Sequence, residues 1–152
     1  QAGEFGHNDF YPVAMAASRE AGFDGNGALR LMLLIDEIRG RLAEVFPLRK
    51  YAIDHVHHGA VASAAAFTAA LGGTVSQIES AIGLVVSHYV PFRAIRAGSQ
   101  LSDSKGSSAA FAAETAVSSA ISTRLARTGL HVCSRVSSGI QYFLNSGKTV
   151  VA

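Results

Sequence analysis

Three histidines stand close together in the segment IDHVHHGAVASAAAF, where a short polar stretch leads into a long alanine-rich run. His55, His57 and His58 could bind a metal ion, transfer protons, or serve only as hydrogen-bonded structural residues. On a helix their spacing does not place all three on one face, and the zinc-binding pattern of two histidines four residues apart is missing from this segment. The sequence therefore predicts no metal here, and it leaves proton transfer and a structural role open.

Positive charges gather in a second segment, PFRAIRAGSQLSDSKGSS, which contains Arg93, Arg96 and Lys105 among glycines and serines. Asp103 is the only acidic residue in this stretch. Long loops inside compact domains often carry function, so these cations could bind an anionic substrate. The alternative is a solvated basic loop.

A further histidine, His7, lies in the segment GHND shortly before Pro12, which is well placed as the first residue of a helix. The N-terminal end of a helix carries unpaired N–H groups and a positive partial charge, and both favour a bound carboxylate or phosphate. The alternative is that GHND is only a polar turn.

The elements that must position these residues are five predicted helices, so we expect an all-α or mainly α fold, a multi-helix bundle. The alanine-rich helix is expected to pack closely against several neighbours, because its small side chains let other backbones approach. Thr74 and Gln77 are spaced as a capping box. The helices are predicted at residues 12–22, from about 27 to 47, from 58 or 59 through the alanine-rich run, 74–91, and from 107 or 108 to 129.

Composition limits the class of protein. The chain has 152 residues, 49% of them apolar and 16% charged, which is typical of one folded domain and not of a disordered chain. A net charge of +2 is far from the basic field of a nucleic-acid-binding protein, and the uncharged run from residue 56 to 78 is broken by two glycines, which argues against a membrane span. Cys133 is the single cysteine, so no internal disulfide is expected and a reducing compartment fits.

Five sequence blocks in order carry a resemblance to a known family. The blocks GHND, DEIRGRLAE, IDHVHHGAVASAAAF, LGGTVSQIESAIGLVVSHYVPFRAIRAG and SDSKGSSAAFAAETAV resemble the MmgE/PrpD superfamily, and especially 2-methylcitrate dehydratase, over residues 6–130. This resemblance assigns residues 1–130 to part of the family's helical domain and leaves residues 131–152 as a tail without a match. It also implies a separate α/β lid, which family members use to complete the site.

The resemblance implies a cofactor-free lyase acting on small tricarboxylates, with related branches that decarboxylate cis-aconitate or epimerise iminodisuccinate. His7, His55 and Lys105 fall on family positions expected to be catalytic, and Arg93 and Arg96 on positions expected to bind substrate carboxylates. Dehydration of a citrate-like acid needs proton removal beside a carboxylate and protonation of the departing hydroxyl, which suits two histidines. Lysine and arginine side chains could stabilise the charge that develops.

Two classes of function follow from these patterns. One is a lyase of tricarboxylates, incomplete without the lid; the other is a non-catalytic helical module for binding or oligomerisation that keeps the fold. The family implies the bacterial cytoplasm or the mitochondrial matrix, and no secretory signal is recognised in QAGEFGHNDFYPV. Helices that evolved to be covered would expose apolar surface in a partial domain, so at least a homodimer is expected. No nucleic-acid or membrane partner is expected.

Overall fold

The computed structural model describes residues 8–96 and 103–125, and in this part of the chain the fold is an all-α bundle, as the sequence predicted. No strand occurs in the described residues beyond a single antiparallel bridge between Ile53 and Phe92. The α-helices are α1 (Tyr11–Ala21), α2 (Gly25–Val45), α3 (Val56–Ala70), α4 (Val75–His88) and α5 (Ser108–Leu125). Short 3₁₀ turns connect or precede them: η2 (Asn8–Phe10), η3 (Leu48–Tyr51), η4 (Arg93–Arg96) and η5 (Asp103–Ser107).

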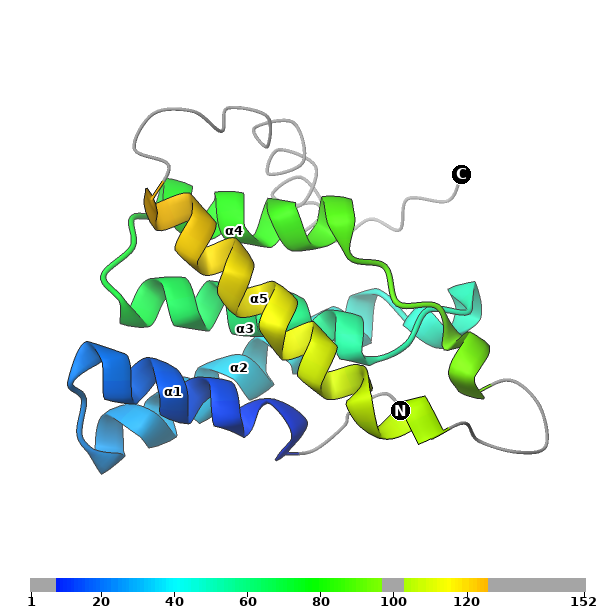
Figure 1. The fold of residues 1–152 in the computed structure, drawn as a ribbon, viewed down its shortest axis with the longest axis horizontal. Coiled ribbons are helices and arrows are strands. Elements are labelled where there is room, and N and C mark those ends of the chain that lie inside the picture. The colour runs from blue at the N-terminus through cyan, green and yellow to red at the C-terminus, as the bar shows by residue number, and fades with distance from the viewer. Residues whose placement is uncertain (1–7, 97–102, 126–152) are drawn as a thin grey trace.

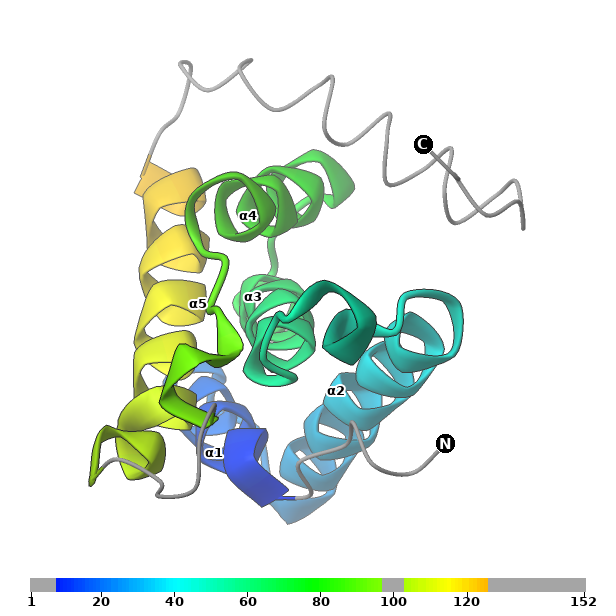
Figure 2. The same ribbon diagram turned by 90° about the vertical axis from the view of Figure 1, so that its right-hand side faces the viewer.

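Helix α3 is the centre of the bundle, and α1, α2, α4 and α5 all pack against it. Figure 2 looks nearly along α3 and shows the other four helices around it, while Figure 1 shows α5 lying across its front. Of the 15 residues of α3, 13 are buried, which explains why this helix is apolar on every side instead of amphipathic. Its alanines let several helices approach one axis closely, as the alanine-rich run predicted.

Two helices begin earlier than the sequence predicted, and in both cases an aspartate explains the difference. Helix α3 starts at Val56 and not at residue 58 or 59, because the Asp54 carboxylate accepts a hydrogen bond from the Val56 N–H. Helix α2 starts at Gly25 and not near residue 27, because the Asp24 carboxylate accepts from the Gly27 N–H and caps it.

Several other predicted helix boundaries are confirmed, although α4 ends at His88 and not at residue 91, and α2 ends at Val45 and not at residue 47. Pro12 lies in the first turn of α1, and Gly22 ends that helix in the left-handed conformation at φ 69°. Thr74 and Gln77 form the predicted capping box, in which each side chain bonds the other residue's backbone N–H. The predicted start of the last helix at Ser108 is also confirmed, whereas its predicted end at Gly129 lies outside the described residues.

The apolar side chains that recur at helical spacing along α2, among them Leu31, Leu34, Ile35 and Val45, are only partly buried. Leu31 and Ile35 belong to the core, but Leu34 and Val45 are exposed, because α1 and α3 cover a narrower strip of this helix than the pattern suggested. Arg39, in the same helix, has a side chain only 1% exposed. In the described part of the chain no helix is long and apolar enough to cross a membrane.

Candidate active site

Backbone hydrogen bonds bring the histidine cluster and the start of the cationic segment together. The Asp54 N–H donates to the Pro91 carbonyl at 2.7 Å, and the Arg93 N–H donates to the Ala52 carbonyl at 2.9 Å. These bonds flank the bridge between Ile53 and Phe92. Arg93 is therefore fixed beside the N-terminal end of α3, although it lies 38 positions after His55 in the sequence.

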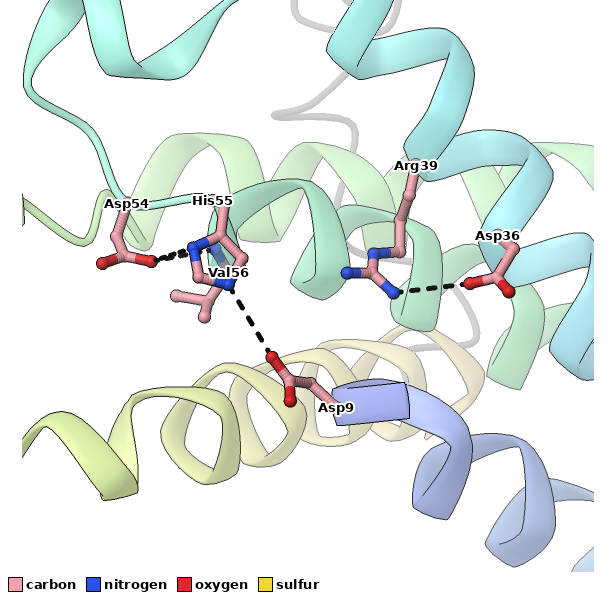
Figure 3. A network of polar contacts seen from close by, with 6 residues as sticks. All are labelled: Asp9, Asp36, Arg39, Asp54, His55 and Val56. Carbon is pink, nitrogen blue, oxygen red and sulfur yellow. Dashed lines mark hydrogen bonds and ion pairs between the residues drawn. The ribbon is translucent and has the colours of Figure 1, made fainter. Parts of the chain in front are cut away.

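His55 lies between two carboxylates at the N-terminal end of α3 (Figure 3). Its Nδ1 is 2.9 Å from Oδ1 of Asp54, whose side chain is 1% exposed, and its Nε2 is 3.7 Å from Oδ2 of Asp9. The His55 side chain is itself 16% exposed, so it is largely enclosed and still reached by solvent. One nitrogen of the imidazole thus faces a buried acid and the other faces an accessible one.

The turn η2, which carries Asp9, is anchored by Phe10. The Phe10 ring is completely buried and lies directly over Gly59, where an added Cβ would come within 1.9 Å of the ring. The guanidinium of Arg39 lies over the same ring, 5.0 Å from its centroid, a cation–π distance. Glycine at position 59 therefore lets η2 seat against α3 and places Asp9 opposite His55.

Arg39 links this anchor to a polar network on α2. Its guanidinium pairs with the Asp36 carboxylate at 3.4 Å, and Tyr11 donates a 2.6 Å hydrogen bond to the same carboxylate. Burial lowers the pKa of Arg39, while Asp36 and Asp9 oppose that shift; the hydrogen bond to Asp36 is the main reason that the pKa of Tyr11 is raised. The network holds α1, α2 and η2 together behind the site.

The other two histidines of the cluster point elsewhere, as their spacing predicted. Nδ1 of His57 is 2.9 Å from the Tyr89 carbonyl, so this ring ties α3 to the end of α4. His58 is 3% exposed, and both of its ring nitrogens are buried. Burial lowers the pKa of His57 and lowers that of His58 to about 4, with nearby His57, Arg39 and His55 adding to the second shift. His57 thus connects two helices, and His58 is a core residue.

The cationic segment folds into two turns that pack together, η4 and η5, and η5 also packs against α5. Arg93 is half-buried at the start of η4, and Lys105 is exposed in η5. Neither side chain is paired with an acidic residue whose side chain the structure describes. Arg96 ends η4 but its side chain lies outside the described part, and His7 lies outside it altogether.

The structure thus brings together three of the five predicted site positions, His55 and the turns that carry Arg93 and Lys105, at one end of the bundle. Figure 1 shows these turns near the start of α5 and on the same side as the N-terminal end of α3. An imidazole held by a carboxylate can take or give a proton at its other nitrogen, and the cations on these turns can bind carboxylates of a substrate.

Sequence reasoning missed the two acidic neighbours of His55. Asp54 directly precedes His55, and consecutive helical residues normally point apart, so adjacency did not suggest a contact. The contact forms because Asp54 lies just before the helix, where its side chain turns back over the first turn. Asp9 belongs to the segment GHND, but nothing in that segment indicated that its carboxylate would face His55. In the residues that the structure describes, no group of three or more His, Cys, Asp or Glu is arranged to hold a metal ion.

Comparison with known proteins places the chain in a family. A family model for the MmgE/PrpD N-terminal domain matches residues 1–151. The match extends past residue 130, where the sequence resemblance stopped, and the boundary proposed there stays a prediction. Comparisons with curated proteins and with solved structures gave no match. Because the family model covers nearly the whole sequence, the chain belongs to the MmgE/PrpD family, in its N-terminal domain.

Proposed function

We propose that this chain provides a proton-transfer and substrate-binding site of a cofactor-free lyase that dehydrates small tricarboxylates, of the type that converts 2-methylcitrate to 2-methyl-cis-aconitate. The observation that carries the proposal is the position of His55, with one ring nitrogen against buried Asp54 and the other directed to the side of η2. Arg93 is half-buried and its N–H bonds to the Ala52 carbonyl near the same end of α3, so its guanidinium would supply the positive charge that a substrate carboxylate requires.

The dehydration divides into tasks that these side chains suit. Nε2 of His55 would take the proton from the carbon beside a substrate carboxylate, and the electron pair of that C–H bond would form the double bond as the C–O bond breaks. Arg93 and Lys105 would bind the carboxylates and stabilise the negative charge that develops beside the carbon. The departing hydroxyl would leave as water after protonation by a second group, for which the family pattern suggests His7. Arg96 is a further candidate for carboxylate binding.

Turnover tests this proposal directly. The chain is incubated with 2-methylcitrate, and the new double bond is followed by ultraviolet absorbance. We expect His55→Ala to lower turnover by at least about 100-fold, since general acid–base catalysis typically contributes that much. His88→Ala is the matched control, because His88 is exposed at the end of α4 and contacts none of the site residues described above. An unchanged rate in His55→Ala removes this residue from the mechanism.

Two alternatives belong to the same experiment. A decarboxylase of cis-aconitate or an epimerase would use the same histidine and cations, and it is distinguished by offering those substrates in parallel. A non-catalytic helical module is favoured by the exposed apolar side chains Leu29 and Leu33 on α2 and Phe111 and Leu125 on α5, which suit a protein partner or a second copy. Wild-type chain that binds none of these substrates favours the module, whereas binding without turnover fits a lyase that lacks its lid.

A further inference from the structure

We infer that Asp54 is the positioning residue of His55: it holds the imidazole proton on Nδ1 and thereby leaves Nε2 as the basic nitrogen that faces the site. The inference deepens the proposed function, and its relevance to catalysis rests on that function. The structural part stands on its own, because it concerns which nitrogen of His55 carries the proton.

The first argument is distance. Nδ1 of His55 is 2.9 Å from Oδ1 of Asp54, a separation typical of a hydrogen bond. A carboxylate oxygen can only accept, so an unprotonated Nδ1 at this distance would set two lone pairs against each other. The proton is therefore on Nδ1 in the neutral ring, and Nε2 is left free to accept a proton.

The second argument is that Asp54 is itself held in place. Its Oδ1 also accepts from the Val56 N–H at 3.2 Å, and its own N–H donates to the Pro91 carbonyl at 2.7 Å. With the side chain 1% exposed, this carboxylate is almost shielded from solvent, which strengthens its electrostatic interactions. Asp54 is thus fixed by α3 on one side and by the chain after α4 on the other.

The third argument is the contrast with Asp9. This second carboxylate is 3.7 Å from Nε2, beyond hydrogen-bond distance, and its side chain is 38% exposed. Asp9 therefore attracts a positive His55 without fixing the neutral tautomer. Figure 3 shows the same contrast: Asp54 lies against one edge of the His55 ring, and Asp9 faces the opposite edge across a gap. A neutral imidazole between them presents an unprotonated Nε2 toward η2.

The tautomer is measured by nitrogen-15 NMR of the histidine rings, at a pH where His55 is neutral, with its signals assigned by their loss in His55→Gln. In the wild-type chain we expect the proton on Nδ1. In Asp54→Ala we expect the ratio of the Nδ1–H to the Nε2–H form to fall at least about tenfold, the size set by losing a hydrogen bond to a charged group. Asp9→Ala is the matched control, and it should leave this ratio unchanged.

Asp54→Asn provides a second variant that keeps an oxygen acceptor in the same position, should the alanine variant not fold. The neutral amide oxygen accepts a hydrogen bond about half as strong as that of the carboxylate. The ratio of the Nδ1–H to the Nε2–H form in Asp54→Asn should therefore lie between the ratios of the wild type and Asp54→Ala. The inference is overturned if the wild-type proton is on Nε2, if Asp54→Ala and Asp54→Asn both keep the wild-type ratio, or if Asp9→Ala shifts it instead. Unfolding of helix α3 would not reproduce this order of wild type, Asp54→Asn and Asp54→Ala. It would instead shift the signals of His55, His57 and His58 together.

Turnover separates this inference from the proposed function. If His55 is the base, Asp54→Ala should lower kcat at least about tenfold while KM changes little, since the ring would be misprotonated and not lost. A tautomer that shifts as expected in a chain that neither binds nor turns over these substrates leaves the inference standing and contradicts the proposed function. Turnover that depends on His55 but not on Asp54 supports the proposed function and contradicts a role for Asp54 in catalysis, whichever tautomer the NMR spectra show.

Discussion

Gly59→Ala should destabilise the chain, although alanine is normally the better residue in a helix. Position 59 lies within α3, where replacing glycine by alanine would by itself stabilise by about 1 kcal/mol. The new Cβ would instead lie 1.9 Å from Cε2 and 2.1 Å from Cζ of Phe10, where ordinary contact begins at 3.4 Å. The ring must therefore move by about 1.5 Å, within a completely buried position beside Arg39.

The size of the destabilisation follows from the core contacts that the Phe10 ring would lose. Expelling Phe10 resembles a large-to-small core substitution, which costs about 3 to 5 kcal/mol. Against this stands the helix-propensity gain of about 1 kcal/mol, so we expect a net loss of about 2 to 4 kcal/mol in the free energy of unfolding. Urea unfolding followed by circular dichroism measures it, because the linear extrapolation resolves differences of this size.

A double-mutant cycle shows whether the Phe10 contact is the cause. In a Phe10→Ala background, Gly59→Ala should become neutral or stabilising by up to about 1 kcal/mol, since the clashing ring is gone. Gly25→Ala is the matched control, because a Cβ there meets nothing within 4 Å. Gly59→Ala that is as stable as wild type, or a loss that persists without Phe10, would refute the seating of η2 on α3.

Two other predictions concern pH and self-association. Because burial lowers the pKa of His58 from 6.5 to about 4, the unfolded chain binds more protons between these values; stability is full above pH 6.5 and is lost as the pH falls. Between pH 7.5 and 5 we expect His58 to account for a loss of about 2 kcal/mol in the free energy of unfolding. His58→Gln should reduce the pH dependence of this free energy, measured by urea unfolding, by the same amount. A pH dependence as steep as that of the wild type would contradict the prediction. For self-association, the exposed Leu29, Leu33, Phe111 and Leu125 predict at least a dimer, measured by sedimentation equilibrium, and Leu33→Lys should weaken it. A monodisperse monomer at high concentration, for wild type and variant alike, would count against this surface.

The sequence predicted the helices well because their determinants are local. The Thr74 and Gln77 capping box, Pro12 at the start of α1 and Gly22 at its end act within one turn of chain, so their spacing alone identifies them. The alanine-rich run likewise predicted a central helix, because a helix with apolar residues on every side must be covered on every side.

The surroundings of the site could not be predicted in the same way. That Asp9 faces His55 depends on the Phe10 ring fitting over Gly59, a contact between residues 49 positions apart. The burial of Arg39 depends on the same ring and on Asp36, and nothing in the spacing of the charged residues of α2 distinguishes it from the exposed Arg41. The side-chain contact of Asp54 with its neighbour His55 exists only because both precede the helix proper. Such contacts are properties of packing and not of sequence spacing.

Calorimetric titration with 2-methylcitrate tests the central claim most directly, which is that the end of the bundle around His55 binds small tricarboxylates. We expect saturable binding to the wild-type chain, and its loss or a drop of at least about tenfold in affinity when Arg93 and Lys105 are both replaced by alanine, since each removes a charged partner of a carboxylate. Arg30→Ala with Arg41→Ala removes the same charge from the exposed face of α2 and should leave binding unchanged. Absence of heat with 2-methylcitrate, cis-aconitate and citrate alike, or equal binding by both double variants, would contradict the claim.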